Sequence, residues 1–290
     1  MADSTAWIIG AGRVGTAFAH VMKNHGIAVL NIISAKYSRA QALAARTGAK
    51  AYATIPEHEP WPDWLALTVR DDVIADVVEL LDARVKPQNQ HTACFHCSGV
   101  HGSSLLKPLA EHGWNTFSFH PIQTFYSVEI RPEVVENIYV GIEGDEPGLQ
   151  AARRLADTLG WKPMVIPKDK KALYHAACVF ASNFITANFG AALDILASIG
   201  IPENKAREAL LPLSQTSLNA LAHLPPHEAI TGPLVRGDVD TVENHLRVLS
   251  TNGLYRNMYK EICNTILEML QRHDLSPEWL DKMQSVLKSE

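Results

Sequence analysis

Short apolar runs alternate with longer amphipathic stretches over the first 167 positions of the chain. The runs have the length and the aliphatic content of buried parallel strands. They predict strands at 7–9, 27–33, 50–53, 65–69, 92–97, 115–119, 139–142 and 162–166, with helices between them that include 16–23, 72–83, 103–112 and 149–159. This alternation predicts an α/β fold, a doubly wound parallel sheet with helices on both faces and right-handed crossovers.

The pattern changes at Pro167, after which the chain has almost only helical periodicity. Apolar positions recur at helical spacing, and glycines and prolines mark the gaps between helices. The predicted helices cover 170–199, 203–221, 238–249, 254–272 and 277–288. We therefore expect a sheet domain over 1–167 and an all-helical C-terminal domain over 168–290.

The predicted helix 170–199 is apolar over most of its surface rather than along one stripe. A helix of this kind is buried, either in the core of its own domain or under a partner subunit. Its alanine-rich face indicates a homodimer built through the helical domain.

The first predicted strand runs into a glycine-rich turn that matches G-x-G-x-x-G. In such a turn Gly10 permits the sharp bend, Gly12 lets the backbone approach a pyrophosphate, and Gly15 lets the next helix pack tightly on the sheet. The helix then directs its free N–H groups and positive dipole end at the phosphates. The turn predicts a Rossmann dinucleotide site formed by Gly10, Ala11, Gly12, Arg13, Val14 and Gly15.

The second predicted strand ends without the acid that would bind the ribose of NAD. That acid is expected about 20 residues after the glycines, yet no Asp or Glu occurs between Asp3 and Glu57. Two hydroxyls and two cations stand there instead, at Ser34, Lys36, Ser38 and Arg39. These groups would make charge-assisted hydrogen bonds to a 2′-phosphate, so the predicted cofactor is NADP(H). The alternative is that the two cations only solvate the start of a helix.

Three of the thirteen histidines stand where a strand end or a helix start would bring them near that cofactor. His96 ends one predicted strand and His120 ends the next. Ligands of open α/β sheets bind outside the carboxyl ends of the strands. We therefore expect His96 and Val69 beside the cofactor, with its nicotinamide end near Ser98 and His120.

His175 is the third of these histidines, and it lies near the start of the long apolar helix. It shares one helical face with Lys171, Ser182 and Thr186. Polar groups on such a helix need partners or a wet cleft. Histidine can hold a proton near neutral pH because its reference pKa is about 6.5. The predicted proton donor is therefore His175, with His120 second.

Three further polar side chains complete the predicted catalytic set as orienting hydrogen-bond groups: Ser98, Ser182 and Asn183. The alternative for both histidines is a structural one, in which they only tie the two domains together.

Two other stretches could carry chemistry. Cys94 and Cys97 have a zinc-like spacing, but in a strand they point to opposite faces and no second pair is evident, so no metal is predicted. The loop 231–238 is either a plain helix connection or a substrate or subunit-contact loop in which Arg236 faces an anion.

Composition excludes several classes of function. The 290 residues carry a formal net charge of −5 and no basic field, so nucleic acid is not an expected partner. No apolar run is expected to reach the roughly 20 residues that span a membrane. The N-terminus has no signal-peptide pattern, so a cytoplasmic location is expected.

Taken together, five motifs resemble a family of Rossmann-like proteins that carry the domain of unknown function 2520. They are Gly10-x-Gly12-Arg13-Val14-Gly15, His96-x-Ser98-Gly99, His120-Pro121-x-Gln123-Thr124-Phe125, Tyr174-His175-Ala176-Ala177 with Ser182-Asn183, and Thr231-Gly232-Pro233-x-x-Arg236-Gly237-Asp238. The family is similar in layout to pyrroline-5-carboxylate reductase, ketopantoate reductase and the β-hydroxyacid dehydrogenases, whose helical domain often dimerises and closes the site.

The chain departs from these patterns in two places. Arg70 stands where the family normally has proline, and the glycine-rich helix with Lys and Asn four residues apart, which marks β-hydroxyacid dehydrogenases, is absent. The resemblance implies reductase chemistry and leaves the substrate open.

The sequence thus predicts an NADPH-dependent oxidoreductase that reduces a small carbonyl or imine compound, of which a 2-oxo acid such as ketopantoate is one example. The alternative is a non-catalytic NADP(H)-binding sensor or assembly protein, which would bind the cofactor without turning it over. An S-adenosylmethionine methyltransferase shares the glycine-rich turn, but the span without acids from 4 to 56 argues against it.

Overall fold

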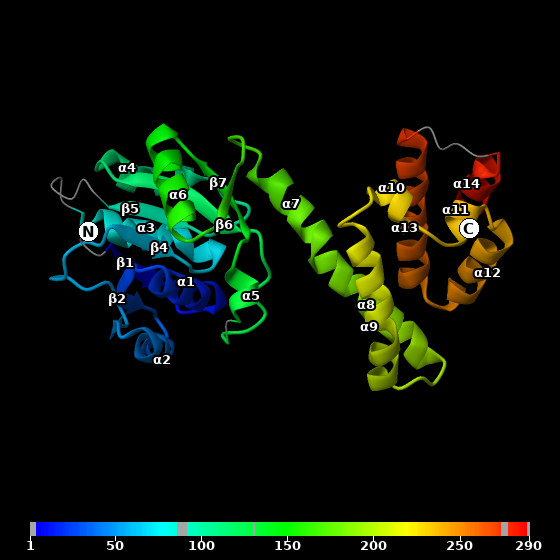
Figure 1. Cartoon of the computed structure of the whole chain (residues 1–290), viewed down its shortest axis with the longest axis horizontal. Coiled ribbons are helices and arrows are strands. Elements are labelled where there is room, and N and C mark those ends of the chain that lie inside the picture. The colour runs from blue at the N-terminus through cyan, green and yellow to red at the C-terminus, as the bar shows by residue number, and fades with distance from the viewer. Residues whose placement is uncertain (1–3, 86–91, 130, 274–277, 289–290) are drawn as a thin grey trace. The chain divides into compact units, whose positions relative to one another are not determined.

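The computed structural model describes residues 4–85, 92–129, 131–273 and 278–288 (Figure 1). The chain forms two compact units, Met1–Phe184 and Ile185–Glu290. The first contains the sheet and the second is helical, as the hydrophobic pattern predicts. The division falls after Phe184 rather than at 167, because the first helix after the sheet packs on the sheet unit.

Among the described residues, the sheet unit holds eight strands in the order β3-β2-β1-β4-β5-β6-β7-β8. Their bounds are β1 Thr5–Ile9, β2 Ala28–Ile33, β3 Lys50–Tyr52, β4 Trp64–Leu67, β5 Ala93–His96, β6 Asn115–Pro121, β7 Tyr139–Gly144 and β8 Lys162–Val165. Strands β1 to β6 are mutually parallel, and β8 is parallel to β7.

The fully parallel sheet expected from the sequence is corrected at one pair, because β7 runs antiparallel to β6. The described part of the connection between them contains the one-turn helix α5 (Pro132–Val135) in place of a full crossover helix. A parallel neighbour needs such a crossover, whereas an antiparallel one does not. His120 on β6 therefore lies directly opposite Gly141 on β7.

Helices cover both faces of the sheet. One face packs against α1 (Arg13–Asn24), α2 (Tyr37–Thr47) and α6 (Glu146–Thr158), and the other against α3 (Ile74–Asp82) and α4 (Lys107–Glu111). Single 3₁₀ turns, η1 (Asp71–Val73) and η2 (Ser103–Leu106), precede α3 and α4. Side chains alternate along β1, so Ile8 enters the first core and Trp7 the second. Each fully buried large side chain stabilises the unit by about 1.5–3 kcal/mol relative to exposure.

The outermost strands differ from the central ones. At one edge β3 has three residues and begins with Lys50. At the other edge β8 carries Lys162 and Pro163, and all four of its residues are exposed. Charged and proline residues of this kind are common on sheet edges.

The single helix predicted over 170–199 is interrupted. Helix α7 (Lys171–Ala181) ends at Ser182, whose φ of −134° and ψ of −70° are not helical. Helix α8 (Asn183–Ser198) follows at once. The prediction missed the break because the apolar pattern continues across it. The break lies next to the boundary between the two compact units.

The second unit is built from short and long helices. They are α9 (Glu203–Ala220), α10 (Pro226–Ala229), α11 (Pro233–Arg236), α12 (Val239–Val248), α13 (Gly253–Arg272) and α14 (Leu280–Lys288), with the 3₁₀ turn η3 (Leu249–Thr251) before α13. Its core consists of Leu234, Val239, Val242, Leu246, Cys263, Leu267, Leu280, Met283 and Leu287. The last helix was predicted to start at residue 277, which lies outside the described residues.

The loop 231–238 has a structural role in this core. Gly237 has a φ of +70°, and a Cβ there would lie 2.3 Å from the ring of Trp279. Asp238 caps α12 by accepting a hydrogen bond from the Thr241 N–H at 3.1 Å. Arg236 is exposed.

Helices α8 and α9 contribute little to any core of the chain. No residue of α8 is buried, and α9 buries Ala206. Large apolar side chains on them are exposed, including Phe184, Leu211 and Leu213 at 45%, 55% and 64%. Exposed apolar surface of this extent marks an interaction site.

Within the described residues, the stretch 171–198 is long and apolar enough to cross a membrane, with a mean hydropathy of 1.4. The expectation that no run reaches this length is therefore corrected. Its first residue, Lys171, is buried against the sheet, where its Nζ donates to Ser118 Oγ at 2.8 Å. The start of this stretch is thus a packed protein helix, and we propose that its apolar continuation is covered by a second copy of the chain.

We expect light scattering at micromolar concentration to give the mass of a homodimer. The interface should exceed roughly 2,000 Å², as in obligate dimers. Leu213→Glu, on the exposed face of α9, should shift the protein to monomer, while Leu80→Glu on the sheet unit should not. A monomer for the parent protein would contradict this assembly.

Candidate active site

The glycine-rich turn joins β1 to α1 as the sequence predicts. Gly10 has a φ of +115°, and its N–H donates to the Ile33 carbonyl at 2.8 Å. A Cβ on Gly10 would lie 2.6 Å from the backbone of Thr68, and one on Gly15 would lie 1.9 Å from the Gly10 carbonyl oxygen. The Thr68 hydroxyl donates to the same oxygen at 2.7 Å. Two of the three glycines are therefore required by packing alone.

Gly12 is different, because a Cβ there would meet nothing within 4 Å. Gly12 is the N-cap residue of α1, and no side chain caps the helix N-terminus. The first turn also contains no acid. Free N–H groups beside open space form an anion site, as expected for the pyrophosphate of a dinucleotide.

A cavity of about 590 Å³ extends from this turn across the ends of β1, β2 and β4. Its apolar wall comes from Ile55, Val69, Val73 at the end of η1, and the face of α3 that carries Val77 and Leu80. The predicted residues that line it are Gly10, Ala11, Gly12, Ser34, Lys36, Arg39 and Val69. An apolar slot next to cationic groups suits an adenine with a phosphorylated ribose.

A second cavity of about 500 Å³ lies between α1 and α2. Three arginines line it, Arg13, Arg39 and Arg46. Arg46 was not predicted as a site residue, although its spacing from Arg39 places both on one face of α2. Arg39 lines both cavities, so its side chain is shared between them.

The remaining predicted cofactor residues lie outside these cavities. Ser38 is exposed, Val14 and Gly15 pack within the turn, and His96 is fully buried. His96 Nε2 lies 2.9 Å from the Gly102 carbonyl. Burial lowers the pKa of His96 to about 4, so this residue is a neutral structural histidine.

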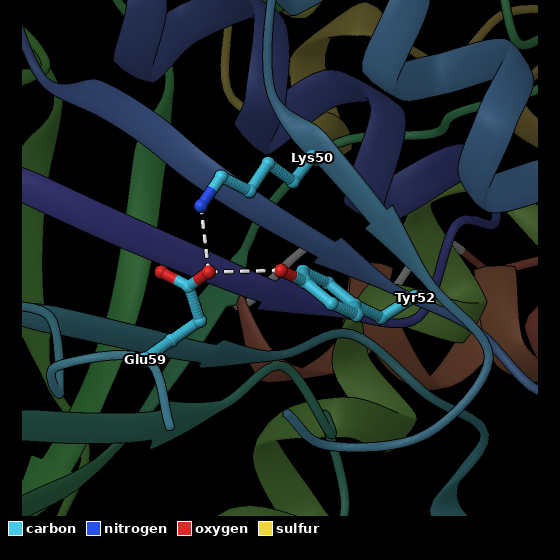
Figure 2. A network of polar contacts seen from close by, with 3 residues as sticks. All are labelled: Lys50, Tyr52 and Glu59. Atoms are coloured by element: carbon cyan, nitrogen blue, oxygen red, sulfur yellow. Dashed lines mark hydrogen bonds and ion pairs between the residues drawn. The ribbon is translucent and has the colours of Figure 1, made fainter. Parts of the chain in front are cut away.

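A surface network supports the wall of the larger cavity (Figure 2). Glu59 Oε1 accepts hydrogen bonds from Lys50 Nζ at 2.6 Å and from the Tyr52 hydroxyl at 2.9 Å. These bonds lower the pKa of Glu59, so its carboxylate stays ionised. The network closes the loop that contains Ala53, Thr54 and Ile55, all of which line the cavity.

Two predicted catalytic histidines meet at the end of β6. The rings of His120 and His175 lie 5.7 Å apart in an edge-to-face arrangement. Gly99 makes room for both, because a Cβ there would lie 2.2 Å from His175 Cδ2 and 3.0 Å from His120 Nε2. His175 belongs to the sheet unit, so the two histidines do not tie two domains together.

A cavity of about 330 Å³ opens beside these histidines. His120, His175, Ser182 and Asn183 line it together with Gln123 and Thr124. The Thr124 and Ser182 hydroxyls are 2.9 Å apart and form a hydrogen bond. Four of the five predicted catalytic residues therefore share one cavity.

Ser98 is the fifth, and its side chain has a structural task. Its hydroxyl donates to Asp71 at 2.8 Å and accepts from the N–H groups of Val100 and His101. It holds the turn that presents Gly99 to the histidines.

The environment of His120 changes the chemistry expected of it. Burial lowers the pKa of His120 to about 3, with further contributions from Lys171 and His175. His120 is therefore a neutral imidazole at physiological pH and does not supply a proton as an imidazolium. Its Nδ1 lies 2.7 Å from the Tyr174 hydroxyl, a partner that sequence analysis did not assign to the site.

Lys171 is also more important than predicted. Its side chain is buried, and burial lowers the pKa of Lys171 to about 8, although Glu143 acts in the opposite direction. The ammonium lies 5.3 Å from the centroid of the Tyr174 ring. Lys171 fixes α7 on β6 through Ser118, and so fixes both Tyr174 and His175 relative to His120.

The sheet order connects these regions. The glycine-rich turn follows β1, and His120 lies on β6, three strand positions away in the order β1-β4-β5-β6. Neighbouring strands are about 4.8 Å apart, so roughly 14 Å separates β1 from β6, a distance that an extended dinucleotide spans. The arrangement can bind a dinucleotide and orient a small polar acceptor beside two histidines.

Cys94 and Cys97 face opposite cores, as expected from strand geometry. Among the described residues no group of three or more His, Cys, Asp and Glu side chains could hold a metal ion.

Two family descriptions match the chain. A Rossmann-like domain covers residues 2–121, and a domain of unknown function, DUF2520, covers residues 138–266. Both were predicted from the motifs. No curated protein sequence matches the chain.

Solved structures share the fold over nearly the whole chain. Protein TM1727 from Thermotoga maritima is 27% identical with a TM-score of 0.71, covering 93% of this chain and 99% of that protein. A protein described as an NADP oxidoreductase from Bacteroides fragilis is 23% identical with a TM-score of 0.71, covering 91% and 98%. The 1-pyrroline-5-carboxylate reductase of Streptococcus pyogenes is 17% identical with a TM-score of 0.60, covering 90% and 97%. The chain is thus structurally similar to NAD(P)-dependent oxidoreductases.

The glycines allow a matched test of the cofactor site. Gly15→Ala should destabilise the fold by about 1–3 kcal/mol or more, because its methyl group would overlap the Gly10 carbonyl. Gly12→Ala should leave thermal unfolding unchanged and weaken NADPH binding, because its methyl group projects into the open space. Unchanged NADPH affinity in stable Gly12→Ala would contradict a pyrophosphate site at this turn.

Arg39 should decide between the two nicotinamide cofactors. We expect the parent protein to prefer NADPH over NADH. Arg39→Ala should weaken NADPH by about 1.5 kcal/mol, a low value for a bond to a charged group because Arg39 is exposed. NADH binding should change little, as measured by fluorescence titration. Equal affinity of the parent protein for both cofactors would refute the assignment.

Proposed function

Because the chain joins a Rossmann-like domain to a DUF2520 domain, we propose that it is an NADPH-dependent reductase of a small carbonyl or imine compound. The observation that carries this proposal is the histidine-lined cavity three strand positions from the glycine-rich turn. A cofactor sensor needs the glycine-rich turn but has no use for polar groups arranged around the separate, histidine-lined cavity.

The residues of the chain fit NADPH. The open face of Gly12 and the uncapped start of α1 suit the pyrophosphate, and Arg39 and Lys36 suit the 2′-phosphate. When bound, NADPH supplies a hydride. The protein must then orient the acceptor and supply a hydrogen-bond donor or proton to the atom that gains negative charge.

The two histidines would divide these tasks. His120 is neutral and can only donate a hydrogen bond, in the manner of a neutral electrophilic imidazole. His175 is half-buried and lines the same cavity, so it is our choice for the proton donor. Ser182 and Asn183 would orient the substrate from the end of α7 and the start of α8.

Turnover separates the reductase from its alternative, a sensor or assembly protein. NADPH absorbance should be followed with a panel of 2-oxo acids, aldehydes, ketones and cyclic imines, the cyclic imines included because a pyrroline-5-carboxylate reductase shares the fold. Oxidation with one class identifies a reductase and its substrate class. Tight NADPH binding without oxidation by any member favours the sensor.

With a substrate found, His175→Asn should lower kcat by about 10²–10⁴, as for loss of a general acid, and leave NADPH binding near normal. His223→Asn in the second unit is the matched control and should change neither. The pH profile between about 5 and 8 should contain no ionisation from His120, because its pKa of about 3 lies below that window. A His175→Asn variant with parental kcat would make His175 structural.

A further inference from the structure

Tyr174 occupies a position that only a glycine neighbour allows. Gly141 lies inside β7, directly opposite His120 on β6. A Cβ on Gly141 would lie 2.4 Å from the Tyr174 hydroxyl oxygen and 2.7 Å from Cζ. Gly141 does not have a positive φ, so its backbone conformation does not require glycine. A strand-interior glycine is unfavourable and often marks the close approach of another group.

The close approach places the phenol against His120. The Tyr174 hydroxyl lies 2.7 Å from His120 Nδ1, and the two rings are perpendicular at 5.5 Å. Helix α7 supplies Tyr174 and is held on β6 by the Lys171 bond to Ser118. The hydrogen bond between Tyr174 and His120 thus depends on the register of β6 and β7, on Gly141, and on the bond that holds α7 on β6.

The direction of this bond follows from the acidity of its partners. Burial raises the pKa of Tyr174 well above its usual range, and burial lowers that of His120 to about 3, so both groups are neutral. A phenol O–H is far more acidic than the N–H of a neutral imidazole, and an unprotonated imidazole nitrogen is a strong acceptor. Tyr174 therefore donates and Nδ1 accepts.

Cys178 is the competing partner, because it also hydrogen bonds with Tyr174. Sulfur is a weak acceptor and S–H a weak donor. The arrangement that satisfies all three groups has the thiol donating to the phenol oxygen and the phenol donating to His120.

A neutral imidazole that accepts at Nδ1 must carry its proton at Nε2. Nε2 is the atom nearest to the Gly99 position, on the side where His175 lies. Besides Tyr174, the titratable groups that act on His120 are Lys171 and His175, whose positive forms both disfavour a charged ring.

We propose that Tyr174, seated on Gly141, is a positioning residue that locks His120 in its Nε2–H tautomer, so that a fixed N–H donor faces the histidine-lined cavity. The use of this N–H donor toward a carbonyl or imine rests on the proposed function, whereas the tautomer of His120 does not. The same structure assigns Gly141 a role that neither the motifs nor the fold predicts.

The test uses the full chain labelled with ¹⁵N-histidine and a long-range ¹H–¹⁵N correlation spectrum, without cofactor. The His120 signals are identified by their loss in His120→Gln. The parent protein should show a pyridine-type shift at Nδ1 and a pyrrole-type shift at Nε2. An Nδ1–H pattern, or shifts averaged between the two tautomers, would overturn the proposal without the need for any variant.

Two variants then test whether Tyr174 sets the tautomer of His120. Tyr174→Phe removes the donor, and Gly141→Ala displaces it with an added methyl group, so both should give averaged shifts at the two His120 nitrogens. Tyr139→Phe, an exposed tyrosine on the same strand as Gly141, is the matched control and should leave the His120 signals unchanged. A parental His120 pattern in folded Tyr174→Phe or Gly141→Ala would show that Tyr174 does not set the tautomer.

This result is independent of turnover. If the tautomer is as proposed but no compound is reduced, the reductase proposal fails and the positioning role stands. If a substrate is found but the tautomer of His120 is not fixed, the reductase proposal stands and the positioning role of Tyr174 fails.

Discussion

The contact between Gly15 and the Gly10 carbonyl is the constraint on which the sheet unit depends. It lets α1 start immediately after β1, while the Thr68 hydroxyl binds the same carbonyl from β4. Two strands, one turn and one helix are therefore fixed around a single oxygen atom. The uncapped N-terminus of α1 then lies at the cavity that extends across the ends of β1, β2 and β4. No side chain larger than hydrogen fits at either glycine, so this arrangement can be read directly from the sequence.

Features that depend on local periodicity or on backbone sterics were predictable. The strands, the two-part organisation and the glycine-rich turn belong to this class, and so do His120 and His175, because strand ends and helix starts position them. Features that depend on contacts between distant segments were not. Antiparallel β7, the break at Ser182 and the boundary after Phe184 leave no trace in the apolar pattern. Tyr174 and Gly141 become meaningful only when β6, β7 and α7 are placed together.

Burial also reverses a conclusion drawn from reference chemistry. A histidine with an ordinary pKa could serve as an acid near neutral pH, and this was the reason for considering His120. Inside the protein, desolvation, with smaller contributions from Lys171 and His175, lowers the pKa of His120 and keeps the ring neutral. The residue still lines the cavity, but as a neutral imidazole rather than a source of protons. The same burial makes Lys171 an anchor whose amine is unusually easy to deprotonate.

The two outer strands of the sheet limit how copies of this chain can associate. Pro163 on β8 has no N–H to offer to an added strand, and the charged neighbour Lys162 would have to lose water. Strand β3 is too short, and its Lys50 is engaged with Glu59. Growth of the sheet from one subunit into another is therefore blocked at both ends. Such blocking protects against open-ended aggregation by strand addition, which has no natural end point, unlike a closed pair of subunits.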